Sequence, residues 1–268
     1  MDTLKKMMTR SSSKASQSSD KDKDPTKKTT NPRVIMIVDE TGSMMSNKAV
    51  TISSYNEFLQ TQANSATEDE EATDVTAFTL VKFNTNSRTN EYKDIKEAPM
   101  MTDKTYNPTN MTALYDAICD TLQNYKDEED NICAIITDGA ENSSRRYNRK
   151  QAMDMIKEFT DKKGWLFNFL ACNMDAMAVG SGMNIAANQC QSFAASEDGF
   201  RDAYARNEVQ MQAQRGYQRY KRKAMYSKQV DNSAPPPEFE NFDSYFAAKG
   251  SSIQANVQKE KMSRNVKK

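Results

Sequence analysis

The chain has 268 residues, contains no histidine, and balances 37 Lys and Arg residues against 37 Asp and Glu residues. This length has room for one sizeable α/β domain with extensions, or for two small domains. The absence of histidine excludes a Ser-His-Asp triad, a Cys-His pair and an imidazole zinc site, so any catalysis would depend on carboxylates, lysines or a metal-bound water.

The two ends of the chain are basic and its middle is acidic. Residues 1–33 carry 9 basic and 4 acidic side chains, residues 201–268 carry 14 and 7, and residues 34–200 carry 14 and 26, a net charge of −12. Charged runs with few apolar residues usually form solvated tails. We therefore expect a disordered basic tail at 1–32 and a mostly disordered tail at 229–268, which also carries a small aromatic cluster (Phe239, Phe242, Tyr245 and Phe246).

The first regular elements follow the basic tail. The apolar run at 34–38 predicts a buried parallel strand, because it is too short and too β-branched for a confident helix. Apolar side chains at helical spacing predict a helix at 47–64, and residues 75–83 read as a second strand. The polar, alternating run at 87–95 is typical of an exposed edge strand paired antiparallel to it.

Helices and strands alternate in the next part of the chain. The pattern predicts helices at 112–125, 148–163, 175–182 and 198–227, and strands at 131–137, 165–172 and 191–195. This alternation predicts an α/β fold: a doubly wound, mainly parallel sheet with one antiparallel edge strand, flanked by helices. The fold would occupy 33–200, and a helix at 201–228 would pack on it or extend from it.

The cysteines and the hydropathy indicate a compartment. The four cysteines show neither close pairing nor metal-type spacing, so we expect buried free thiols and a reducing environment. No apolar run approaches the roughly 20 residues that span a bilayer, and the amino terminus has no apolar signal region. The sequence therefore predicts no membrane contact and a cytoplasmic location. The cysteines are Cys119, Cys133, Cys172 and Cys190.

A metal-binding pattern directly follows the first predicted strand. Asp39 ends the apolar run, and hydroxyl side chains follow at alternate positions, Thr41 and Ser43. Open α/β sheets place their ligand sites at the carboxyl ends of strands, where these oxygens would lie. Oxygen ligands suit a hard cation, Mg²⁺ or Mn²⁺. The sequence therefore predicts a divalent-metal site at this loop.

Two later loops extend this pattern. Residues 110–118 (Asn-Met-Thr-Ala-Leu-Tyr-Asp-Ala-Ile) open a predicted helix, and residues 136–142 (Ile-Thr-Asp-Gly-Ala-Glu-Asn) end a predicted strand. In this order and spacing, the three loops resemble the von Willebrand factor A-type domain with its metal-ion-dependent adhesion site. The similarity covers about residues 33–215 and is greatest to stand-alone microbial and phage-encoded domains, which share runs such as 105–108 and 163–165.

The resemblance implies a ligand set and a function. The family's first loop reads Asp-x-Ser-x-Ser, its second loop supplies a threonine and its third an aspartate. Thr41 departs from this pattern, because serine is usual there, but threonine keeps the hydroxyl. The resemblance also implies an open coordination position that an acidic side chain of a partner protein fills, and hence a protein-binding module rather than an enzyme. The implied ligands are Asp39, Thr41, Ser43, Thr112 and Asp138.

Each of these residues also has a simpler interpretation. Asp39 could cap the helix behind it, Ser43 or Thr112 could be a helix N-cap, and Asp138 with its following glycine could be only a turn. Glu40 and Glu141 read as solvated side chains.

The sequence is also compatible with two other functions. One is a Mg²⁺-dependent phosphotransferase or hydrolase, because residues 39–41 are similar to the Asp-x-Asp-x-Thr motif of haloacid-dehalogenase-like phosphatases. Thr41 stands where the second aspartate of that motif belongs, so the general acid is missing. The other is an adaptor subunit beside a ring ATPase. The chain has no GxxxxGK loop and would not be the motor itself.

A basic and aromatic stretch near the C-terminus indicates a different partner. Cations that alternate with tyrosines can grip phosphates and stack bases, which suggests nucleic-acid binding through the basic tails. The alternative is a basic helix end that packs its tyrosines on the domain. The oligomeric state stays open, and the subgroup resemblance suggests host cytoplasm or virion association if the chain is phage-encoded. The cations are Arg215, Arg219, Lys221, Arg222 and Lys223.

Overall fold

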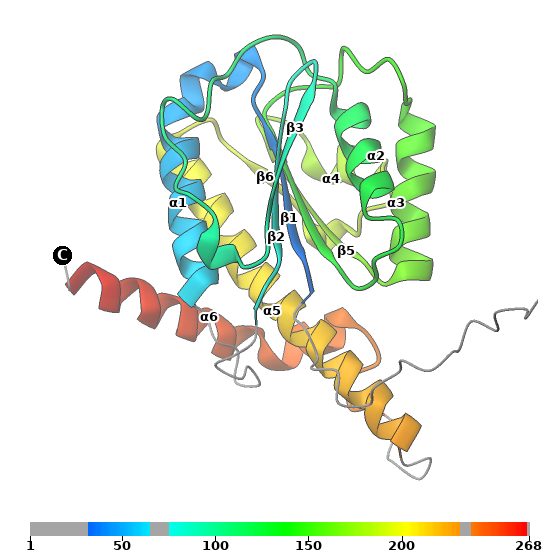
Figure 1. Ribbon diagram of the computed structural model, residues 1–268. Coiled ribbons are helices and arrows are strands. Elements are labelled where there is room, and N and C mark those ends of the chain that lie inside the picture. The colour runs from blue at the N-terminus through cyan, green and yellow to red at the C-terminus, as the bar shows by residue number, and fades with distance from the viewer. Residues whose placement is uncertain (1–31, 65–74, 231–236, 267–268) are drawn as a thin grey trace, which may run out of the picture.

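The computed structural model describes residues 32–64, 75–230 and 237–266, so the predicted tail at 1–32 lies almost wholly outside it. Within these ranges the strands form a single sheet in the order β3-β2-β1-β4-β5-β6 (Figure 1). Every neighbouring pair is parallel except β2 and β3. The predicted fold class is confirmed. The strands are β1 Val34–Asp39, β2 Phe78–Phe83, β3 Ser87–Tyr92, β4 Ile132–Thr137, β5 Leu166–Cys172 and β6 Cys190–Phe193.

The central strands are apolar throughout because helices cover both faces of the sheet. In β1, Val34 and Met36 belong to one core cluster, whereas Ile35 and Ile37 belong to the other. Both clusters are shielded from water, so the strand needs apolar residues at successive positions. Most of β3, in contrast, is exposed. Its polar side chains suit an edge strand, where they discourage pairing with another chain.

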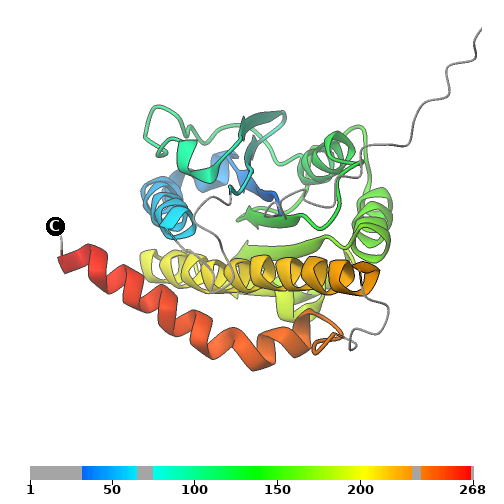
Figure 2. The same cartoon turned by 60° about the horizontal axis from the view of Figure 1, so that its bottom comes forward.

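The helices divide between the two faces (Figures 1 and 2). One core cluster contains side chains of α1 and α5, and the other contains side chains of α2, α3 and α4. Short 3-10 helices η1, η2 and η3 connect the elements. The helices are α1 Lys48–Asn64, α2 Leu114–Asn124, α3 Arg149–Lys163, α4 Ala176–Ser181 and α5 Glu197–Val230, with η1 at Gly42–Asn47, η2 at Ile95–Glu97 and η3 at Ala187–Gln189.

A sixth helix, α6, spans Phe242–Val266 and lies along α5 (Figure 2). The prediction of a mostly disordered segment at 229–268 is therefore wrong for this part. Phe242 and Tyr245 pack on Tyr217 of α5, with ring centroids 6.0 and 5.8 Å apart. Lys261 lies 2.8 Å from Glu208. Only a narrow stripe of α6 is buried, so most of its residues are polar. This polar composition is the reason why the sequence predicted disorder instead of a helix.

Two further properties of the described residues are the state of the cysteines and the hydropathy of the helices. All four cysteines are buried free thiols, as predicted. Burial raises the pKa of the Cys119 thiol to about 12. Among the helices of the described ranges, none is both long and apolar enough to cross a lipid bilayer.

Candidate metal centre

Three loops meet at the carboxyl edge of the sheet. β1 and β4 are parallel neighbours with Val38 opposite Ile136, so Asp39 at the end of β1 and Asp138 just beyond β4 emerge side by side. The loop before α2 joins them, because the Gly42 amide donates a 3.0 Å hydrogen bond to the Asn110 carbonyl. The topology thus brings together segments that lie far apart in sequence.

Asp39 is fully buried and held on both carboxylate oxygens. Oδ1 accepts a 2.7 Å hydrogen bond from the Thr41 amide, and Oδ2 accepts one of 2.6 Å from the Thr137 hydroxyl. Burial, with a smaller contribution from the carboxylate of Asp138, raises the pKa of Asp39 to about 6 in spite of these hydrogen bonds, which favour the charged form. A cation held nearby would favour the charged form of Asp39.

The other first-loop side chains form a chain of oxygens that ends on Asp138. The Ser43 hydroxyl donates a 2.6 Å hydrogen bond to Asp138 Oδ1, and Thr41 Oγ1 lies 3.0 Å from Ser43 Oγ. Because Ser43 gives its only hydrogen to Asp138, Thr41 is the donor to Ser43. Neighbouring ligands around Mg²⁺ lie about 2.9 Å apart, given octahedral bonds of 2.0–2.1 Å. These three side chains already have the spacing of adjacent metal ligands.

Thr112 reaches the same place from the loop before α2. A Cβ atom on Gly139 would lie 3.1 Å from Thr112 Oγ1 and 3.5 Å from Ser43 Oγ. Both hydroxyls therefore border one small space, which stays open because residue 139 lacks a side chain. Burial raises the pKa of Asp138, which lies at the same space. The Asn47 amide donates a 3.3 Å hydrogen bond to Asp138 Oδ2.

The structure thus brings all five predicted side chains to one edge, and their residue types fit a divalent cation. Ser43 lies within η1 rather than at its N-cap, and the N-cap of α2 is Ala113, so neither Ser43 nor Thr112 acts as a helix cap. In the described ranges no group of three or more carboxylate, thiol or imidazole side chains is arranged to hold a metal. A metal at this edge would therefore need the hydroxyl oxygens as ligands.

Three further residues support the site, although the sequence motifs assign none of them a role. Thr137 binds the Asp39 carboxylate, Asn47 binds Asp138, and the Tyr106 hydroxyl donates a 2.6 Å hydrogen bond to the Asp39 carbonyl. The only available signal for Thr137 is its place directly before Asp138. Tyr106 lies in a run shared with the resembling domains, and Asn47 carries no local signal.

Two acidic residues predicted to be solvated are instead bound within the protein. Glu40 is 1% exposed, forms an ion pair with Arg88 and accepts a 2.6 Å hydrogen bond from the Asn107 amide. Glu141 accepts hydrogen bonds from loop amides, including that of Ser144 at 2.7 Å. The prediction failed because their partners belong to other loops or to a turn that sequence pattern does not reveal.

The predicted nucleic-acid contacts are largely inaccessible. Arg215 and Arg219 are each 2% exposed. Arg215 donates hydrogen bonds of 3.2 Å to Gln62 Oε1 and 3.1 Å to the Thr76 hydroxyl. Both arginines face the interior because α5 lies between the domain and α6, so assigning them to nucleic acid is a misreading.

The rest of this stretch also contacts the protein itself. Lys221 and Arg222 form ion pairs with Asp130, and only Lys223 of the five cations is exposed. Tyr220 packs on Phe239, with ring centroids 5.1 Å apart. The structure agrees with the alternative interpretation, in which the helix end packs its tyrosines against the protein.

No protein-family model and no curated protein sequence matches the chain. Solved structures that match include proximal thread matrix protein 1 from the mussel byssus, with a zinc-occupied MIDAS motif (13% identity, 65% of this chain, 46% of that chain, TM-score 0.49). Another is the vWF domain of the type V pili tip protein Mfa5 from Porphyromonas gingivalis (11%, 68%, 96%, 0.49). A third is manganese-loaded Plasmodium vivax TRAP protein (14%, 53%, 57%, 0.34).

The chain spans less than half the length of the mussel protein, and these matches establish nothing about function. The observed sheet, with its antiparallel edge strand, agrees with the von Willebrand factor A-type fold that the sequence motifs resemble.

Proposed function

We propose that the chain is a divalent-metal-dependent protein-binding module, whose metal bridges to an acidic side chain of a partner protein. The observation that carries this proposal is the convergence of the Ser43 and Thr112 hydroxyls with Asp138 around the space beside Gly139. Thr41 and Asp39 complete the oxygen set. Because all the donors are oxygens, Mg²⁺ or Mn²⁺ is the cation that fits.

The charge of the donor set explains why the partner would be acidic. Asp39 and Asp138 supply two negative charges, and the three hydroxyls are neutral, so a bound divalent cation has no excess of negative charge around it. When bound, the metal would supply a Lewis-acidic position to which an outside carboxylate can coordinate. The nearby carboxylate of Glu40 does not compete, because Arg88 pairs with it.

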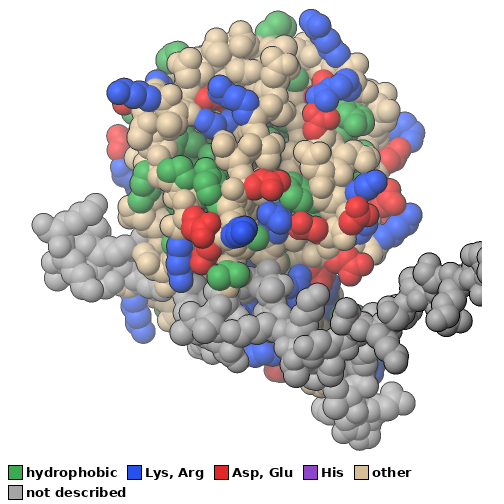
Figure 3. Space-filling model, in the orientation of Figure 1, with side chains coloured by type: hydrophobic (Ala, Val, Ile, Leu, Met, Phe, Trp, Pro, Cys, Tyr) green, Lys and Arg blue, Asp and Glu red, His purple; other side chains and the backbone are tan. Residues whose placement is uncertain are grey.

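The surface around the site suits such a partner. Met45, two residues after Ser43, and Met111, directly before Thr112, are 53% and 54% exposed, and Arg145 of the third loop is also exposed. On the face shown in Figure 3, acidic side chains gather mainly in the lower half, away from the upper edge where the site lies. Apolar and basic rim residues favour an acidic side chain with apolar neighbours.

The other functions gain no specific support. The Thr41 hydroxyl contacts Ser43, and no carboxylate stands at the position that the phosphatase motif requires. An adaptor role beside a ring ATPase differs from the proposal only in the identity of the partner, so it remains a special case of protein binding.

Titration of the metal-free chain with Mn²⁺ and Mg²⁺ by calorimetry tests the metal site. Wild type should bind one ion, Asp39→Asn and Asp138→Asn should bind far more weakly, and Asp154→Asn should behave as wild type. Asp154 is a matched control because its side chain is 62% exposed on α3. Absence of binding by wild type would refute the proposed site.

A second experiment tests the partner. The tagged chain is used to capture proteins from source-cell lysate with Mg²⁺, with EDTA, and as the Asp39→Ala variant. A partner retained only by wild type with Mg²⁺ is the expected result. A partner that binds equally in all three conditions would show that recognition does not use the metal.

A further inference from the structure

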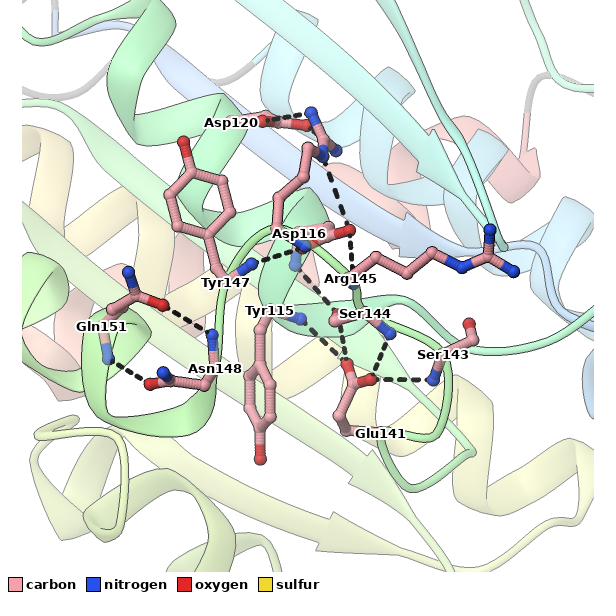
Figure 4. A network of polar contacts seen from close by, with 11 residues as sticks. Tyr115, Asp116, Asp120, Glu141, Ser143, Ser144, Arg145, Tyr147, Asn148 and Gln151 are labelled. Atoms are coloured by element: carbon pink, nitrogen blue, oxygen red, sulfur yellow. Dashed lines mark hydrogen bonds and ion pairs between the residues drawn. The ribbon is translucent and has the colours of Figure 1, made fainter.

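Two carboxylates outside the metal centre bind the backbone of the loop that follows Asp138 (Figure 4). Asp116, in the first turn of α2, is 6% exposed. Its Oδ1 accepts hydrogen bonds from the amides of Arg146 at 3.0 Å and Tyr147 at 2.9 Å, and its Oδ2 accepts one from the Arg145 amide at 3.0 Å. One side chain of α2 thus holds three successive amides of the loop.

Glu141 holds the earlier half of the same loop. Its Oε1 accepts hydrogen bonds from the amides of Ser143 at 2.9 Å and Ser144 at 2.7 Å. Its Oε2 accepts one from the Tyr115 amide at 3.0 Å and one from the Ser144 hydroxyl at 2.7 Å. Glu141 therefore ties the loop both to itself and to the start of α2.

Residues 139–147 form neither helix nor strand. The hydrogen bonds to Asp116 and Glu141 therefore hold this loop in place of the backbone bonds of regular secondary structure. The same loop is joined directly to Thr112. The Thr112 carbonyl accepts hydrogen bonds of 3.0 Å from the amides of Asn142 and Ser143, and the Thr112 amide donates one of 2.9 Å to Asn142 Oδ1. Three hydrogen bonds thus fix the position of Thr112 relative to the loop after Asp138.

The hydrogen bonds from the loop amides to Asp116 depend on the negative charge of its carboxylate. Burial by itself raises the pKa of Asp116, but the three loop amides and the Arg146 guanidinium outweigh burial and lower it. An ionised carboxylate accepts hydrogen bonds on both oxygens, whereas an amide or a protonated acid offers only part of that capacity.

We propose that Asp116 and Glu141 are positioning residues for the metal centre. They hold the loop after β4 against α2, so that Thr112 and Asp138 face each other across the space beside Gly139. This inference rests on the proposed metal-binding function. Neither residue would contact the metal, because their carboxylate oxygens accept hydrogen bonds from amides of the loop and of α2 and from the Ser144 hydroxyl.

The test is Mn²⁺ affinity of the full chain, measured by titration calorimetry and by the electron paramagnetic resonance signal of free Mn²⁺. Asp116→Asn and Glu141→Gln should each weaken binding by roughly tenfold or more, the range typical of residues that orient metal ligands. Asp120→Asn is the matched control and should bind as wild type. Asp120 lies one turn along α2, and within the described residues its carboxylate accepts hydrogen bonds from the Arg146 side chain and from no loop amide.

A double-mutant cycle separates positioning from general loss of stability. If Asp116 acts by placing Thr112, the losses from Asp116→Asn and Thr112→Val should not multiply in the combined variant. Losses that multiply fully would overturn the inference. Glu141→Gln, which keeps an acceptor oxygen and the side-chain shape, provides the same test if Asp116→Asn fails to fold.

The two proposals fail in different ways. If wild type binds Mn²⁺ and folded Asp116→Asn and Glu141→Gln bind it equally well, the positioning role is refuted and the metal site stands. If wild type does not bind Mn²⁺, both are refuted.

Discussion

The Ser43 hydroxyl donates a 2.6 Å hydrogen bond to Asp138, which lies 95 residues further along the chain. This contact joins the loop after β1 to the loop after β4 beside Gly139, where an added Cβ would lie 3.5 Å from Ser43 Oγ. The space next to Gly139 is therefore the feature on which metal binding should depend most directly.

Gly139→Ala should weaken Mn²⁺ binding at least tenfold. The added Cβ would lie 3.1 Å from Thr112 Oγ1 and 3.5 Å from Ser43 Oγ, within the space that the cation would occupy. The metal-free protein should lose no more than about 1–3 kcal/mol of unfolding free energy, the usual cost of crowding a packed site. Calorimetric titration and urea denaturation measure the two effects, and wild-type affinity in the variant would contradict the assigned position of the metal.

The stability of the metal-free protein should fall as the pH rises from about 4 to 7. The pKa of Asp39 is about 6 in the folded chain, against an ordinary value of 3.8, so the folded state holds this proton more tightly than the unfolded state. A raised carboxyl pKa makes ionisation oppose folding, here by an amount on the order of 3 kcal/mol at pH 7.

Urea denaturation in EDTA at pH 5 and pH 7 measures this dependence, and Asp39→Asn should reduce it. Saturating Mg²⁺ should oppose it as well, because the cation stabilises the ionised carboxylate. Equal pH dependence in wild type and Asp39→Asn would show that Asp39 is not the group responsible.

Arg215→Met should lower the free energy of unfolding by about 1.5–3 kcal/mol, the range for hydrogen bonds that involve a charged group. Arg215 is 2% exposed, and its guanidinium binds Gln62 and Thr76. Lys223→Met is the matched control, because its exposed side chain should change stability by less than about 0.5 kcal/mol. Equal stability of the two variants would contradict the placement of α5.

Lys261→Met should destabilise the protein by about 3 kcal/mol, because it removes a cation 2.8 Å from the buried carboxylate of Glu208. The additional change Glu208→Gln should restore part of this loss, since the carboxylate would no longer require a cation. Denaturation of the single and double variants checks the pairing. A double variant less stable than Lys261→Met would argue against the contact between α5 and α6.

Much of the fold could be predicted from local pattern. The apolar runs of β1, β4 and β5 identify strands buried on both faces, and the polar alternation of β3 identifies the edge strand. Because parallel strands bring their carboxyl ends to one edge, the residues that follow β1 and β4 could be predicted to meet. The grouping of Asp39 and Asp138 follows from that rule.

The remaining features depend on partners that local pattern does not specify. Arg215 is buried because Gln62 and Thr76, 153 and 139 residues away, receive its hydrogen bonds. Likewise Glu40 needs Arg88, and the amides held by Asp116 lie 29–31 residues beyond it.

The sequence by itself therefore determined the order of strands and helices from β1 to α5 and the oxygen-rich loops at the strand ends. Hydrophobic periodicity and strand direction are local properties that a short segment already carries. Only the tertiary structure decided that α6 covers α5, that two arginines are buried, and that Asp116 and Glu141 hold the third loop. A polar side chain by itself favours water, and its burial is tolerated only where donors and acceptors from distant parts of the chain meet it, so local sequence does not specify it.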